Sequence, residues 1–228
     1  MKYLAIVITF IGVGLLFAFV LITKIPSMNS PSAYADLVLK EDGSSNVVSA
    51  IYLDYRLYDS LFEVLVFASA ILGVSYYISH FPEAGEVPPS DSKLFFIATI
   101  AFAPVVAVWG IYILLTGHLS PGGAFSGGAI GASGILFLAL AIGSKKTERA
   151  FHKMHLESLE KCALLALASY ILLGAFNKGF FSPLFWVGTP GKFFSGRGAI
   201  ILNISIGIKV FVGGWTILYL FSRHRESV

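Results

Sequence analysis

The sequence contains very little charge for its length. Only 13% of its 228 residues are charged, against 56% that are hydrophobic, and the mean hydropathy is +0.80. A soluble domain of this size needs more charge to cover its surface. The formal net charge of +3 is too small to indicate a nucleic-acid partner. The composition excludes a soluble domain and indicates an all-α, polytopic integral membrane protein whose surroundings are a lipid bilayer.

Cysteine is almost absent, and so are the motifs of soluble enzymes. The single cysteine, Cys162, excludes an internal disulfide and any multi-cysteine metal cluster formed by this chain alone. The sequence has no Gly-x-x-x-x-Gly-Lys-Ser/Thr phosphate loop, no Gly-x-Ser-x-Gly nucleophile elbow and no His-Glu-x-x-His metal pair. We therefore expect a non-catalytic chain with no cofactor or metal of its own, and transport is the favoured class of function.

Long apolar runs are what the sequence has in abundance. Runs of roughly 20 residues are long enough to cross a bilayer. Six of them predict six transmembrane helices, at residues 3–23, 60–79, 94–116, 124–143, 156–176 and 198–221. Reading the first run as a secretory signal is the less favoured alternative, because a signal is shorter and ends at a cleavage site. We expect Pro104 to kink the third helix rather than end it.

Polar segments separate these runs and suggest a division into modules. We expect aqueous loops at 25–46 and 144–153, and an interfacial or re-entrant loop at 177–197. The proline-rich, acidic stretch at 81–92 is the clearest linker, and it divides a two-helix module, 1–80, from a four-helix module, 93–228. Eight basic residues fall on the side of the termini and six on the other side, which predicts cytoplasmic termini.

Four charged residues, Asp54, Arg56, Asp59 and Glu63, stand at the start of the second predicted span. Spacings of three and four place Arg56, Asp59 and Glu63 on one face of a helix, so we expect Arg56 to neutralise Asp59. Glu63 lies deeper, and a carboxylate inside a membrane indicates function. We interpret Glu63 as a proton or cation relay. The alternative is an interfacial salt-bridge network that anchors the end of the helix.

Lys209 lies near the middle of the last predicted span. A lysine that far from both ends cannot easily extend its ammonium group into water. It needs a partner, either as part of a functional charge network or as a structural ion pair with a neighbouring subunit, and Glu63 is the expected partner within the chain. Glu157 and Glu160 are expected to form a solvated start of the fifth span.

The fourth predicted span begins with a glycine-rich motif. Glycines at every fourth position form a ridge that lets another helix approach closely. The residues expected to provide this packing surface are Pro121, Gly122, Gly123, Phe125, Gly127, Gly128 and Gly131. His118, in the preceding turn, is interpreted either as a relay at the membrane boundary or as a loop histidine with satisfied hydrogen bonds.

Two of these segments resemble one known family. Residues 46–63, NVVSAIYLDYRLYDSLFE, resemble the segment N-x-I-L-V-D-F-R-G-F-D-T-L-G-E near the C-terminal end of the large MnhA protein of Mrp-type (Mnh) multisubunit cation/proton antiporters. Residues 117–128, GHLSPGGAFSGG, resemble the MnhB hallmark G-H-x-S-P-G-G-G-F-x-G-G. Together and in this order, the similarities cover nearly the whole chain. They imply an end of MnhA fused to a four-span MnhB.

The resemblance implies an integral-membrane subunit of a Na+/H+ translocating module in the plasma membrane of a prokaryote. Its expected partners are other membrane subunits, and the expected ions are Na+ and H+. The host would be a stand-alone antiporter or a respiratory complex of the hydrogenase, formate hydrogenlyase or sulfur reductase type. A purely structural subunit and an independent small transporter remain alternatives.

The resemblance also implies roles for individual residues. Asp54, Arg56, Asp59 and Glu63 match the polar signature of the family, in which Glu63 is the acid tied to cation exchange. The MnhB hallmark covers His118 and the glycine motif. Leu57, Phe62 and Ala124 replace glycines of the family pattern, so helix contacts near these positions are expected to differ.

Overall fold

The computed structural model describes residues 31–82, 91–177, 184–185 and 187–224. Within these ranges the chain forms helices and no β-strand, and Gly188 and Ser195 form an isolated antiparallel bridge. The prediction of an all-α protein is confirmed. The elements are α2 (Pro31–Glu41), α3 (Val47–Ala50), the π-helix η1 (Ile51–Tyr55), α4 (Leu57–Ile78), α5 (Lys93–Thr116), α6 (Ala124–Ile142), α7 (Ser144–Lys153), α8 (Leu156–Asn177) and α9 (Ala199–Arg223).

Among the residues that the structure describes, four helices, α4, α5, α6 and α9, are long and apolar enough to cross a membrane. They coincide with the second, third, fourth and sixth predicted spans, and α8 occupies the place of the fifth. Helix α5 continues through Pro104, as expected. The predicted first span, 3–23, and most of the predicted linker, 81–92, lie outside the described residues.

Two segments expected to be loops contain helices instead. Helix α2 lies within residues 25–46, and α7 fills residues 144–153. In α7, Thr147 and Phe151 are buried one turn apart, whereas Lys146 and Arg149 lie toward the outside. The expectation of loops was wrong because a short amphipathic helix needs only a few buried positions, which a mostly polar composition conceals.

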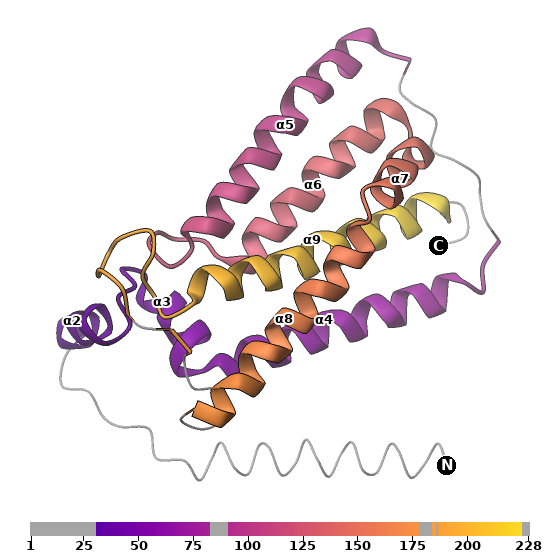
Figure 1. Ribbon diagram of the computed structural model, residues 1–228. Coiled ribbons are helices and arrows are strands. Elements are labelled where there is room, and N and C mark those ends of the chain that lie inside the picture. The colour runs from indigo at the N-terminus through magenta and orange to yellow at the C-terminus, as the bar shows by residue number, and fades with distance from the viewer. Residues whose placement is uncertain (1–30, 83–90, 178–183, 186, 225–228) are drawn as a thin grey trace, which may run out of the picture. The chain divides into compact units, whose positions relative to one another are not determined.

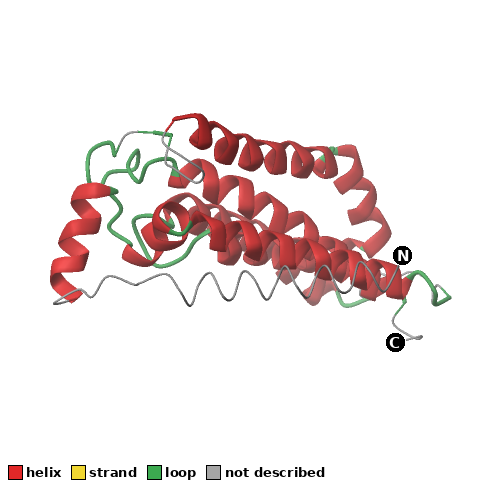
Figure 2. Ribbon diagram, turned by 90° about the horizontal axis from the view of Figure 1, so that it is seen from below, coloured by secondary structure: helices red, strands yellow, loops and turns green. Residues whose placement is uncertain are grey.

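Helix α9 lies at the centre of the bundle. It packs against α4, α6 and α8, and α6 also lies along α5 (Figure 1). Seen from below, the long helices run side by side (Figure 2). The most apolar 18-residue stretch of α9 is 56% buried within the chain, against 11% in α4 and 17% in α5. Helices α4 and α5 therefore present broad apolar faces outward, where lipid or other subunits can contact them.

Glycines allow the closest contacts of α6. A Cβ atom at Gly128 would lie 2.6 Å from the Gly207 carbonyl oxygen of α9. A Cβ atom at Gly127 would lie 2.7 Å from the Cβ atom of Leu114 in α5. We expected this glycine surface to contact neighbouring subunits. At Gly127 and Gly128 it instead contacts α5 and α9 of the same chain.

Candidate functional site

The entrance to α4 is irregular. The π-helix η1 ends at Tyr55, and the next residue, Arg56, with φ of −132° and ψ of 44°, interrupts the helix before α4 begins. Helical segments of this kind occur frequently at functional sites. Asp54, before the break, is only 9% exposed, whereas Arg56 and Glu63 are exposed. The structure thus divides the four charged residues of this region into an outward group and a buried residue.

The outward group consists of Arg56, Asp59 and Glu63. Arg56 Nε lies 2.8 Å from Asp59 Oδ2, which confirms the predicted ion pair. Glu63 follows Asp59 by one turn on the exposed face of α4, beside the exposed Phe62. Because a carboxylate in contact with lipid is energetically expensive, this face requires a neighbouring protein or water.

The buried residue, Asp54, belongs to what we call the polar cap cluster: Asp42, Asn46, Asp54, His118 and Arg197. This cluster lies where η1, the turn between α5 and α6, and the segment before α9 meet at one end of the bundle (Figure 1). Arg197 Nη1 lies 3.3 Å from Asp54 Oδ2. Burial, followed by the charge of Asp42, raises the pKa of Asp54 to about 6, although Arg197 opposes that rise.

Asn46 joins the two segments that carry the family resemblance. Its side chain accepts a hydrogen bond from Ser49 N and thereby caps α3. The same side chain donates to the carbonyl oxygens of Gly117, at 2.7 Å, and Ser120, at 2.9 Å. At Gly123, with φ of 146°, a Cβ atom would collide with the Tyr52 hydroxyl. The two motifs are therefore parts of one packed interface.

His118 is completely buried in this interface. Its Nε2 atom lies 2.9 Å from the Phe193 carbonyl oxygen. Because a carbonyl oxygen only accepts, Nε2 is the nitrogen that carries hydrogen in the neutral ring. Burial lowers the pKa of His118, so the neutral form is favoured. The other ring nitrogen, Nδ1, is buried and has no hydrogen-bond partner among the described residues, so the hydrogen bonds of His118 are satisfied at Nε2 only.

Lys209 is paired, but its partner differs from the one we expected. It forms an ion pair with Glu160 of α8, and both side chains are largely buried. The expectation that Glu63 would be its partner was wrong, as was that of a solvated Glu160. Glu148 of α7 accepts a hydrogen bond from Trp215 Nε1 at 2.6 Å. Charged side chains from α7 and α8 therefore reach α9, which the sequence did not indicate.

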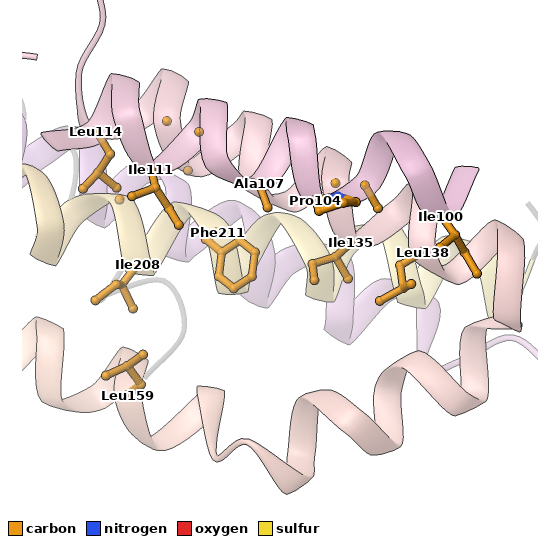
Figure 3. A pocket seen from close by; sticks show the side chains of 17 residues that line it. Ile100, Pro104, Ala107, Ile111, Leu114, Ile135, Leu138, Leu159, Ile208 and Phe211 are labelled. Atoms are coloured by element: carbon orange, nitrogen blue, oxygen red, sulfur yellow. The ribbon is translucent and has the colours of Figure 1, made fainter. Parts of the chain in front are cut away.

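An apolar cavity of about 530 Å³ lies between α5, α6, α8 and α9. Ile111, Ile135, Leu159 and Phe211 are among the side chains that line it (Figure 3). Its 17 lining residues include no charged side chain. A cavity with hydrocarbon walls offers no ligands to an ion, so this space is a poor candidate for an ion path.

The family comparison agrees with this architecture. The model of the family described as "Domain related to MnhB subunit of Na+/H+ antiporter" matches residues 94–217. The chain belongs to this family. The match begins at the second residue of α5 and ends within α9, and it includes the glycine motif of α6.

Relatives of this MnhB-related chain extend the similarity beyond the family match. An uncharacterized protein of Methanocaldococcus jannaschii is 30% identical, over 78% of this chain and 77% of that protein. A probable K+/H+ antiporter protein of Rhizobium meliloti, of the combined A/B type, is 24% identical over 96% of this chain. The chain spans only 25% of that longer relative. The predicted resemblance to Mrp-type antiporter subunits is confirmed.

Two solved complexes contain similar chains. One is a membrane-bound sulfane sulfur reductase, an archaeal respiratory membrane complex, with a TM-score of 0.69 and 27% identity over 97% of this chain and 98% of that one. The other is the Mrp complex from Dietzia sp., with a TM-score of 0.67 and 20% identity over 99% of this chain and 26% of that one. The similarity to the chain of the Mrp complex shows a shared fold. This chain is therefore a membrane subunit of the kind found in Mrp-like antiporters or respiratory complexes.

Proposed function

We propose that this chain is a non-catalytic subunit of a Na+/H+ translocating module and that Glu63 takes part in ion transfer at the boundary with a neighbouring subunit. The observation that carries the proposal is the place of Glu63 on the outward face of α4. A carboxylate there does not serve the core formed by the described helices, and we infer that its binding partner is a neighbouring subunit or water.

The surroundings of Glu63 support such a boundary. The exposed face of α4 also carries Phe62, Leu65 and Val66, and an apolar face of this kind suits contact with another transmembrane helix. The Arg56–Asp59 pair lies one turn nearer the end of α4. Its opposite charges leave Glu63 as the acid whose charge is not balanced within this group. Proton or sodium binding at Glu63 would neutralise that charge.

The test is Na+-dependent proton exchange in proteoliposomes that contain the native complex with Glu63→Gln. The glutamine keeps the shape of the side chain but cannot bind a proton or balance a cation. We expect exchange to be abolished while the complex remains assembled on a native gel. Glu157→Gln is the matched control, because Glu157 is an exposed carboxylate at the start of α8 that lies beside His152. Retained exchange in the Glu63 variant would overturn the proposal.

A purely structural role is the second candidate, and the Lys209–Glu160 pair favours it. This pair neutralises the intramembrane charge of α9 within the chain, as expected of a subunit that only holds helices in register. With this role, Glu63→Gln would weaken binding to neighbouring subunits and leave the exchange rate per assembled complex unchanged.

For orientation, we propose cytoplasmic termini in a prokaryotic plasma membrane, following the distribution of basic residues. The polar cap cluster lies at the end of the bundle opposite to the C-terminal end of α9 (Figure 1). It would therefore face the external side of the membrane.

A further inference from the structure

The wall of the apolar cavity between α5, α6, α8 and α9 continues onto the outer surface of the bundle. Three of its residues, Ile100, Ile111 and Leu159, are 41%, 58% and 45% exposed. Helices α5, α6 and α9 are long and apolar enough to cross a membrane, so the medium at this depth is hydrocarbon. None of the 17 lining side chains has a polar atom that could hold water. The cavity therefore suits an apolar group.

The shape of the cavity limits what can enter it. It extends along α5 from Ile100 to Leu114, a rise of about 21 Å. Figure 3 shows Ile100 and Leu138 at one end of the cavity, and Leu114 and Ile208 at the other. A volume of about 530 Å³ over this length leaves a cross-section of about 25 Å². A helix, which is about 10 Å across, does not fit, whereas one extended hydrocarbon chain does.

The volume corresponds to one acyl chain of a lipid. A cavity of about 150 Å³ lined by Leu, Ile and Phe binds one benzene molecule. On that scale, the cavity of about 530 Å³ holds roughly 20 carbon atoms. One leaflet contributes about 15 Å to the hydrocarbon core, so an acyl chain that enters from one interface can lie within the cavity.

Helix α7 packs directly against the wall of this cavity. The ring of Phe151 in α7 lies 5.9 Å from the ring of Phe211, centroid to centroid, and Phe211 lines the cavity. Phe151 is buried, whereas Lys146, Arg149 and Lys153 are exposed. Their spacings of three and four place these three basic residues on one face of α7. An apolar wall and a basic helix face therefore lie next to each other.

Basic residues outnumber acidic ones at the α7 end of the cavity. Lys93, the first residue of α5, is exposed at the same end and adds to the charge of α7. The acidic residues there are Asp91, Glu148 and Glu157, and the last two already contact other side chains of the chain. The turn at the opposite end, residues 117–123, contains no lysine or arginine. An anionic group would therefore prefer the α7 end.

We propose that the cavity and α7 form a binding site for an anionic phospholipid. One acyl chain lies in the cavity, and the phosphate of the headgroup lies against Lys146 and Arg149. Basic residues on an amphipathic helix at a membrane interface attract anionic headgroups in this way. The lipid fills the space between α5 and α8, which contributes only Leu159 to the lining. The proposal does not involve Glu63.

The test is photocrosslinking in proteoliposomes that contain the native complex. The probes are phosphatidylglycerol, which is anionic, and phosphatidylcholine, which has no net charge, each with a diazirine near the end of one acyl chain. Mass spectrometry of peptides locates the adducts. We expect phosphatidylglycerol to label cavity residues such as Ile135 and Phe211 several-fold more than phosphatidylcholine does. In wild type, excess unlabelled phosphatidylglycerol should suppress this labelling, and excess phosphatidylcholine should not.

Ala107→Trp should block the cavity, because Ala107 lines it and an indole occupies much of its width. Ala101→Trp is the matched control, since Ala101 is an exposed residue of α5 that does not line the cavity. Labelling of cavity residues should be lost in the first variant and retained in the second. If Ala107→Trp does not assemble, the competition between unlabelled lipids in wild type decides.

Lys146→Gln combined with Arg149→Gln should lower labelling by phosphatidylglycerol about fivefold for each basic residue removed, and leave that by phosphatidylcholine unchanged. Lys40→Gln combined with Lys192→Gln is the control, because both residues are exposed and lie outside α7. Equal labelling by the two lipids would overturn the proposal. Absence of adducts on cavity residues would also overturn it and would indicate side chains of a neighbouring subunit in the cavity. The Glu63→Gln exchange assay is independent of these outcomes, so the two proposals can fail separately.

Discussion

Lys209 of α9 and Glu160 of α8 form an ion pair across 49 residues of sequence. Lys209 is buried, and its ammonium has no route to water along its own helix. The pair therefore joins α8 to α9 inside the bundle.

Removing one partner of this pair should destabilise the bundle strongly. Lys209→Met or Glu160→Gln leaves a single charge buried, which costs about 3–5 kcal/mol. The double variant should recover much of that loss, because no unpaired charge remains. A double-mutant cycle on thermal unfolding of the purified complex measures the coupling. Additive single effects would contradict a direct pair.

Gly128→Ala should destabilise the contact between α6 and α9. The new Cβ atom would lie 2.6 Å from the Gly207 carbonyl oxygen and 2.7 Å from Val210 Cβ, so the helices must move apart. Overpacking of this kind costs about 1–3 kcal/mol. The matched control is Gly73→Ala in α4, where nothing lies within 4 Å. Its unfolding temperature should stay the same or rise slightly. Equal effects of the two substitutions would show that close packing at Gly128 is unimportant.

Asn46→Ala should loosen the contact between α3 and the turn that connects α5 and α6. It removes the cap of α3 and both donors to the turn, at Gly117 O and Ser120 O. We expect a loss of about 1–3 kcal/mol in unfolding free energy. Asn46→Asp separates the two roles, since a carboxylate can cap the helix but cannot donate to carbonyls. If Asn46→Asp is as stable as wild type, the bonds to the turn contribute nothing.

His118 should make stability depend on pH. Its folded-state pKa is lowered by burial, so the unfolded chain binds a proton that the folded chain does not. Stability from this group should therefore fall as the pH drops below about 6.5. The Asp54 carboxyl acts in the opposite direction, because its raised pKa favours the folded state at low pH. Comparing the pH profile of a His118 variant with that of wild type separates the contribution of His118 from that of Asp54.

His118→Gln should reduce the loss of stability on acidification, measured as the unfolding temperature between about pH 5 and 8. His80→Gln is the control, because His80 is exposed. An unchanged pH profile in His118→Gln would mean that the pKa of the imidazole is the same in the folded and unfolded chain, which would contradict the effect of burial.

The sequence alone predicted the features that depend only on residues close together in the chain. Continuous apolar runs predicted the membrane helices, since hydrocarbon tolerates only segments whose backbone bonds are satisfied internally. The spacing of Arg56 and Asp59 predicted their ion pair, because residues three apart are neighbours on any helix. The two motifs indicated the family without any knowledge of the fold.

Tertiary structure decided which distant residues meet. Glu63 and Glu160 were both available to Lys209, and the packing of α8 on α9 selected Glu160. Asp54 meets Arg197 across 143 residues, because the π-helix η1 turns it inward and the segment before α9 returns to that place. Spacing along the chain carries no information about such contacts. A buried charge takes whichever partner the helix packing brings within reach, and here that packing left Glu63 facing outward.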